Sequence, residues 1–347
     1  MRKKHRNSAW YKKLSFYSVI LLAAVIVIVS ISISQWWSQN LKPVSDSEQT
    51  RVFVIEQGMN AKEVAHSLEN NNFIRNAKAF EFLCKLEKAD TKLMAGVYNL
   101  APSMSSREIL EVLLKGPVPD VVRVTIPEGY TLEEIIDLLV ANGLGTKQEF
   151  YQAMLSFNAD DYEFLKEVPI TEKRLEGFLF PDTYFFAKDS EPKAILAKFL
   201  DRFEKELTEE ALARLKQLNI SIYTWVTKAS IVEREAAKAE ERPIIAGVFE
   251  NRLNIGMALE SCATVQYILN ERKPVLSLED IAIDSPYNTY KYSGLPPGPI
   301  ANPGHASLNA VLYPAQTKYL FFVAKNDGSH AFAATFEEHL QNVRKYQ

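Results

Sequence analysis

FVIEQGMNAKEVAHSLENNNF at residues 53–73 and VTIPEGYTLEEIIDLLVANGL at residues 124–144 match each other at an offset of 71 residues. Gly58 of the first stretch aligns with Gly129 of the second. In both, an apolar run precedes the glycine, and apolar residues then recur at the spacing of an amphipathic helix. The repeat predicts a duplicated strand, turn and helix, and an α+β fold rather than a regular βαβ series.

The region after each copy divides the chain into two folded parts. The first copy continues to about Gly116, so residues 51–118 predict a small αβ module, which resembles LysM-type glycan-binding modules. A structural spacer is the alternative for this module. Residues 119–347 predict a larger α+β domain, which ends in a strand at 319–324, an Asn-Asp-Gly turn and a returning strand from His330. A capping box of Thr335 and Glu338 predicts a last helix.

The N-terminal sequence predicts a membrane anchor. Residues 1–13 carry six basic side chains and no acid, and the 21 residues from Leu14 to Ser34 carry no charge. A helix of this length is ~32 Å long, enough to span a bilayer. We expect a cytoplasmic basic tail at 1–13, an uncleaved transmembrane helix at 14–36 that ends in interfacial tryptophans, a linker at 37–50, and all later residues outside the cytoplasm.

Composition excludes several classes of protein. The chain has 347 residues, 47% of them hydrophobic, and a net charge of −3, so the part after the basic tail carries −9. Such an acidic domain is a poor nucleic-acid binder. Cys84 and Cys262 are the two cysteines, too few for a disulfide scaffold and without metal-ligand spacing. We expect two isolated buried thiols, although pairing in an oxidising compartment stays open.

The segment ASIVERE, residues 229–235, contains the strongest catalytic candidate. On a helix, Glu233 shares a face with small and apolar residues, namely Val226, Ala229, Ser230 and Ala237. A carboxyl in such surroundings should resist ionisation and serve as the general acid of a glycosidase-like reaction. The alternative is a helix-face acid paired with a Lys or Arg of another element. Glu235 should lie on the solvated face, near Arg234, Lys238 and Arg242.

Loops rich in aromatic residues and proline suggest a sugar-binding wall. The runs YNTY at 287–290 and GLPPGPIANPG at 294–304 are rigid and flanked by aromatic rings, although a proline-rich run is often a plain connection. The candidate substrate-binding residues are Tyr267, Tyr287, Asn288, Tyr290, His330 and Asp182. Asp182 is alternatively a turn-capping acid, and His330 with Glu338 and His339 matches no zinc spacing.

Six ordered motifs together are similar to the endolytic murein transglycosylase family, also called YceG-like. They are EGFLFPDTY (176–184), ASIVERE (229–235), NRLNIGMALES (251–261), TVQY (264–267), YNTY with GLPPGPIANPG (287–304), and GSHAF (328–332). The resemblance covers nearly the whole chain. Where the family often has Asp-Pro, this chain has Cys262-Ala263, so no role of that aspartate is transferred.

The resemblance implies a membrane-anchored enzyme that cleaves peptidoglycan glycan strands internally. Glu233 would be its catalytic acid, the products would end in 1,6-anhydroMurNAc, and no metal or organic cofactor would be needed. Implied partners are the glycan strands, the lipid bilayer and peptidoglycan synthases, with no nucleic acid. Two alternatives remain open: a non-catalytic wall-binding or division scaffold, and a hydrolytic muramidase that uses Asp182 or Glu260 as a second acid.

Overall fold

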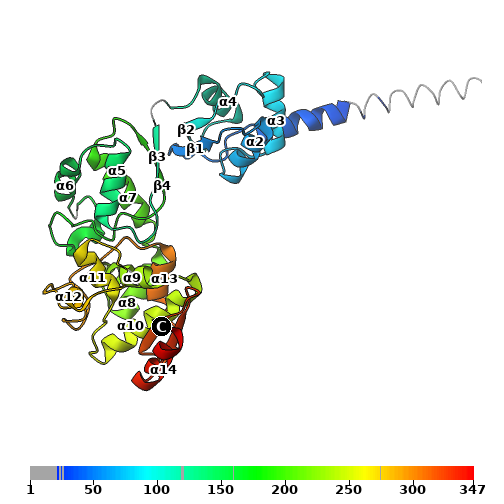
Figure 1. Ribbon diagram of the computed structural model, residues 1–347. Helices are drawn as coiled ribbons and strands as arrows, with labels where there is room; N and C mark the ends of the chain where they lie inside the picture. The colour runs from blue at the N-terminus through cyan, green and yellow to red at the C-terminus, as the bar shows by residue number, and fades with distance from the viewer. Residues whose placement is uncertain (1–21, 23–24, 26, 119–120, 159, 274) are drawn as a thin grey trace, which may run out of the picture. The chain divides into compact units, whose positions relative to one another are not determined.

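A computed structural model of the chain divides it into two compact units, the first ending at Val121 and the second beginning at Val122 (Figure 1). The structure describes residues 22, 25, 27–118, 121–158, 160–273 and 275–347. Residues 14–21, 23, 24 and 26 of the expected membrane span lie outside the described residues, as does the basic tail. None of the described helices has both the length and the apolar character needed to cross a membrane.

The first unit is a small αβ fold. Its elements are β1 (Arg51–Ile55), α2 (Ala61–Asn70), α3 (Ala77–Leu86), β2 (Gly96–Leu100) and α4 (Ser106–Lys115). β1 and β2 are antiparallel, with Phe53 opposite Tyr98. Both side chains are buried against the helices, because alternate residues of a strand point to one face.

The segment predicted as a linker, residues 37–50, makes contacts with the first unit. Residues 27–40 are helical, and the Trp37 ring packs edge-on against Phe82 at 5.1 Å between centroids. The Val44 N–H donates to the Pro102 carbonyl at 3.1 Å. This segment contains apolar side chains that lose water by packing on the module, so it is part of the first unit rather than a free tether.

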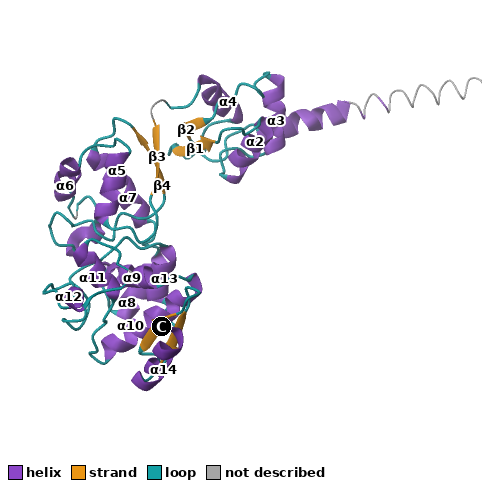
Figure 2. Ribbon diagram, viewed as in Figure 1, coloured by secondary structure: helices purple, strands orange, loops and turns teal. Residues whose placement is uncertain are grey.

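The second unit is mainly helical with two small sheets (Figure 2). Its elements are β3 (Val121–Thr125), α5 (Leu132–Ala141), α6 (Lys147–Leu155), η1 (Glu163–Glu167), β4 (Thr183–Ala187), α7 (Pro192–Glu204), α8 (Glu209–Leu218), α9 (Ile222–Glu235), η2 (Ala239–Glu241), α10 (Arg242–Asn254), α11 (Cys262–Leu269), α12 (Leu278–Ile281), α13 (His305–Leu312), β5 (Phe321–Ala324), β6 (His330–Ala333) and α14 (Phe336–Tyr346). β3 pairs with β4, and β5 pairs with β6. The predicted α+β class is therefore found.

The predicted repeat is also present. The bounds of α5 lie 71 residues after those of α2, and each helix begins with a capping box, Asn60 with Glu63 in one and Thr131 with Glu134 in the other. The C-terminal hairpin of β5 and β6 and the capping box of α14 agree with the sequence prediction.

Helix α9 is the centre of the second unit. It packs against α10 and α13 (Figure 1). Trp225 on α9 is buried, and its indole N–H donates to the Leu308 carbonyl of α13 at 2.8 Å. These contacts fix the helix that carries Glu233 within a rigid core.

Candidate active site

Helix α9 ends at Glu235, which changes the expected surroundings of Glu233. Ala236 has an extended backbone with φ −85° and ψ 108°, and the chain then turns through η2 into α10. Ala237 is therefore beyond the helix and is exposed. Arg242 is the first residue of α10, and its side chain pairs with Glu233 rather than with Glu235. The sequence prediction extended the helical spacing past the real end of the helix.

The Glu233 carboxylate is buried and paired. Its Oε1 accepts a hydrogen bond from Arg242 Nη2 at 3.0 Å, and its Oε2 accepts one from the Gly304 N–H at 3.0 Å. The Glu233 side chain is 5% exposed. The expectation of small, apolar surroundings is thus incomplete, and the alternative of an acid paired with an arginine of another element is found, because a second helix brings Arg242 and a loop brings an N–H group to the carboxylate.

Two further residues complete the contacts of Arg242. Its Nε donates to the Ser307 hydroxyl at 3.0 Å, and its Nη2 lies 3.7 Å from a carboxylate oxygen of Glu128. Glu128 follows β3, directly before the repeated Gly129. Sequence reasoning missed Glu128, Arg242 and Ser307. Glu128 aligns with the neutral Gln57 in the first copy of the repeat. This difference between the two copies is a feature of the sequence that could have singled out Glu128.

Glu235 is not on a solvated face, so that prediction is wrong. The Ser261 hydroxyl donates a hydrogen bond to its carboxylate, and burial raises the pKa of Glu235. Ser261 lies directly before α11, and α11 packs on the face of α9 that the sequence predicted to be solvated. Glu235 faces a small polar pocket that also contains Cys262 and Tyr290.

A second buried carboxyl, Glu176, joins three elements near the site. Its Oε1 accepts hydrogen bonds from the Leu132 N–H at 3.0 Å and from Asn302 Nδ2 at 3.1 Å, and Tyr267 is a further partner. Burial raises the pKa of Glu176 to about 8. Asn302 lies in the same proline-rich loop as Gly304, so Glu176 helps to hold the loop that contacts Glu233.

Glu176→Gln should remove a pH-dependent loss of stability. The folded chain holds the Glu176 proton more tightly than the unfolded chain, so the wild-type free energy of unfolding should fall as pH rises from 4.5 to about 8. The slope contributed by this group is at most about 1.4 kcal/mol per pH unit. Chemical denaturation at several pH values should show a flatter profile for Glu176→Gln, whereas Glu172→Gln, an exposed neighbour, should keep the wild-type slope. Equal slopes for all three proteins would contradict this account.

The predicted substrate-binding residues are not all in one place. Tyr267 packs against Tyr287 at 5.1 Å between ring centroids, beside Glu176. Buried Asn288 holds the carbonyls of its own loop, and Tyr290 contacts the Cys262 thiol at 3.0 Å. These contacts make Asn288 a loop-bracing residue.

His330 and Asp182 make ion-pair contacts with other elements. His330 Nδ1 lies 2.7 Å from a carboxylate oxygen of Glu241, the residue directly before Arg242. Asp182 accepts a hydrogen bond from Arg202 Nε at 2.8 Å and one from the Thr183 N–H. The structure thus places His330 where it supports the start of α10, and Asp182 in a turn.

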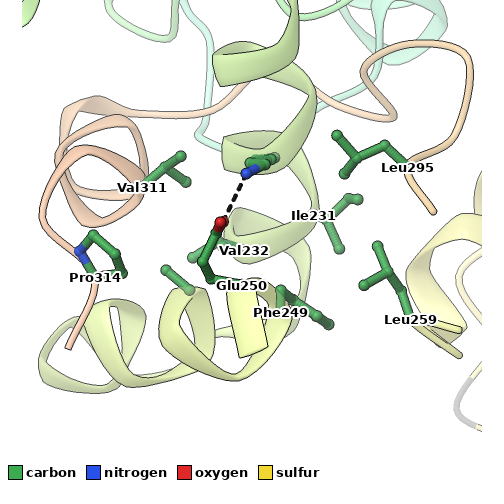
Figure 3. Close-up of a pocket in the computed structure, with 10 residues that line it drawn as sticks. Ile231, Val232, Phe249, Glu250, Leu259, Leu295, Val311 and Pro314 are labelled. Atoms are coloured by element: carbon green, nitrogen blue, oxygen red, sulfur yellow. Dashed lines mark hydrogen bonds and ion pairs between the residues drawn. The ribbon is translucent and has the colours of Figure 1, made fainter. Parts of the chain in front are cut away.

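Two of the hollows beside α9 differ in size and polarity. The one in Figure 3 holds the Lys228–Glu250 ion pair between α9 and α10, and its volume of about 10 Å³ suits one water molecule rather than a sugar. A polar pocket of about 230 Å³ contains Arg234, Gln266, Tyr267 and Arg272. Arg234 also donates to the Gly129 carbonyl, so this pocket adjoins the loop of Glu128.

Neither cysteine is in a disulfide. Cys84 is buried in the first unit, as expected, but Cys262 is exposed in the second, so the expectation of a buried thiol is wrong for Cys262. In the part of the chain that the structure describes, no group of three or more His, Cys, Asp or Glu side chains is placed to hold a metal ion.

Comparisons with known proteins agree over most of the chain. The YceG-like family model matches residues 53–345. An endolytic murein transglycosylase of Bacillus subtilis (strain 168) is 33% identical over 88% of this chain and 88% of its own length. One of Streptococcus pneumoniae serotype 2 is 33% identical over 90% of this chain, which spans 61% of that longer protein. The 2.6 Å crystal structure of a yceG-like protein of Listeria monocytogenes matches with a TM-score of 0.57 and 34% identity, over 85% of this chain and 99% of that one.

Proposed function

The chain belongs to the YceG-like family, and from this premise we propose that it is an endolytic murein transglycosylase in which Glu233 is the single acid–base residue. The observation that carries the proposal is the placement of Glu233. It is a buried carboxyl on the central helix, held by Arg242 and the Gly304 N–H, in the motif that the family uses for its catalytic acid.

One carboxyl is enough for this reaction. Protonated Glu233 gives its proton to the oxygen that links MurNAc to GlcNAc, and that glycosidic bond breaks. The resulting carboxylate then takes the proton of the C6 hydroxyl of the same MurNAc, whose oxygen bonds to C1. The product is a 1,6-anhydro ring, no water is consumed, and Glu233 regains its proton. The aromatic pair Tyr267 and Tyr287 and the adjoining polar pocket are suited to hold sugar rings.

A hydrolytic muramidase needs a second carboxylate that activates water. The sequence candidates have ion pairs that do not involve Glu233 or Arg242, since Asp182 is paired with Arg202 at 2.8 Å and Glu260 with Arg252 at 3.3 Å. Glu128 is the better candidate, since Glu128 and Glu233 both lie within 4 Å of Arg242 Nη2. The names of the relatives favour transglycosylation over hydrolysis.

The first unit is proposed to bind glycan. Its order of strand, two helices and antiparallel strand supports the LysM-like interpretation. In the scaffold alternative, this binding would be the whole function. Purified peptidoglycan incubated with the detergent-solubilised full chain separates these functions. An endolytic enzyme releases long soluble glycan fragments early, whereas a scaffold binds the polymer and releases none.

Membrane anchoring is also a proposal. It is supported by the uncharged stretch after the basic tail and by apolar side chains of the helical residues 27–40, such as Ile28 and Ile33, which are exposed to about 60%. An apolar surface of this kind suits lipid. The enzyme would then act close to the bilayer, near peptidoglycan synthases and their nascent strands.

A reporter enzyme fused after Gln347 should be active only outside the cytoplasm, because the six basic residues retain the N-terminus inside. The measurement uses a periplasmic or surface-active reporter in living cells. A matched fusion after Lys13 should report a cytoplasmic location. Cytoplasmic activity of the C-terminal fusion would contradict the proposed topology.

A further inference from the structure

Arg242 lies between two carboxylates. Its Nη2 is 3.0 Å from Glu233 Oε1 and 3.7 Å from Glu128 Oε2, while its Nε is fixed by the Ser307 hydroxyl. The side chains of Arg242 and Glu233 are 11% and 5% exposed, whereas the Glu128 side chain is 50% exposed. One cation therefore faces two acids, of which only Glu128 is at the surface.

The carboxylates of Glu128 and Glu233 both lie against the backbone of Gly304. Its N–H donates to Glu233, and a Cβ at this position would overlap the Glu128 carboxylate. Gly129, the neighbour of Glu128, lies against the Glu233 side chain, where an added Cβ would be 3.4 Å from Cγ. The two acids are thus held close together by packing.

The reaction requires Arg242 to change partners. When Glu233 holds the proton that it will donate, it is neutral and no longer balances the charge of Arg242. Glu128 is then the nearest carboxylate that can. After proton transfer Glu233 is negative again and regains Arg242. A shift of the guanidinium by less than 1 Å is sufficient, since the two contacts differ by 0.7 Å.

We propose that Glu128 is a positioning residue that pairs with Arg242 while Glu233 carries the proton that it donates to the glycosidic oxygen. The inference rests on the proposed function. Burial and the charge of Glu233 both raise the pKa of Glu128, as expected for two electrostatically coupled carboxyls.

The other charged groups near this pair have their own partners. His305 of α13 lies 2.6 Å from Glu206, and Arg272 binds Glu134 at 2.9 Å. Arg234, on the helix of Glu233, donates to the Gly129 carbonyl and to Gln266. Arg242 is therefore the cation that both Glu128 and Glu233 approach, and the charge of His305 also acts on Glu128.

The test is the pH dependence of kcat/KM for glycan cleavage by the full chain and by Glu128→Gln. Removal of the Glu128 charge leaves Arg242 paired with Glu233 alone, which favours ionised Glu233. In Glu128→Gln, the alkaline limb of the plot of kcat/KM against pH should move to lower pH by about one unit. At pH values above the limb kcat/KM should fall ~10-fold, and at acidic pH it should stay near the wild-type value. Glu128→Asp should restore part of the shift.

Glu250→Gln is the matched control, because Glu250 is a similarly exposed acid that pairs with Lys228 at 2.7 Å. It should keep the wild-type limb. Two results for Glu128→Gln would overturn the inference while the proposed function stands. One is an alkaline limb at the wild-type pH. The other is an equal loss of activity at every pH, as expected for a general base of hydrolysis or for a structural residue. A wild-type chain that cleaves no glycan would instead overturn the proposed function itself.

Discussion

Glu233→Gln should lower the rate of glycan cleavage by roughly 10² to 10⁴, the usual contribution of a positioned acid–base group. The amide has nearly the same size, and its oxygen can still accept a hydrogen bond from Gly304 or Arg242. It cannot donate a proton to the glycosidic oxygen or take one from the C6 hydroxyl. Release of soluble glycan by the full chain, with binding to peptidoglycan measured in parallel, gives the result.

Glu235→Gln is the control for this variant. Glu235 lies on the same helix two residues later, and an amide of nearly the same size carries no charge into its buried surroundings, where burial raises the pKa of the carboxyl. The new amide oxygen can retain the hydrogen bond from Ser261. Most activity should therefore remain. Equal losses in the two variants would indicate a disturbed helix rather than lost proton transfer.

Gly177→Ala should destabilise the second unit by about 3 kcal/mol. Gly177 has φ +89°, and an added Cβ would lie 2.6 Å from Val226 on α9 and 2.6 Å from Pro299 in the loop before Gly304. Backbone strain and overpacking each cost on the order of 1 to 3 kcal/mol. For a unit of this size, the midpoint of thermal unfolding should fall by about 10 °C.

Gly256→Ala separates the two costs. Gly256 has φ +70° with open space around its α-carbon, so the variant carries backbone strain of about 1 kcal/mol and no steric overlap. A loss in Gly177→Ala no larger than that in Gly256→Ala would contradict the packing of α9 against this loop.

Local patterns predicted much of the fold. The strand, turn and amphipathic helix of each copy followed from the repeat, because their pattern is local, and the structure adds the capping boxes at Asn60 and Thr131. The hairpin followed from its turn residues. The contacts of residues 37–50 with the first unit did not follow from local patterns, because their hydrogen-bond partners are backbone groups of Pro102 and Ser103, far along the chain.

The candidate site was only half predictable. Glu233 followed from helix geometry and from the family motif. Its partners did not, because the contact with Arg242 depends on where α9 ends, and the contact between Arg242 and Glu128 depends on a loop far earlier in the chain. Glu235 was misplaced for the same reason, since α11 covers it through Ser261.

The chain ends produced in water labelled with heavy oxygen test the central claim most directly. The full-length wild-type chain should produce glycan strands that end in 1,6-anhydroMurNAc, each one water lighter than the hydrolysed sugar and without heavy oxygen, because the C6 hydroxyl of MurNAc replaces water. Mass analysis of the fragments gives the answer. Reducing MurNAc ends that carry one heavy oxygen would show hydrolysis and would contradict the single-acid mechanism assigned to Glu233.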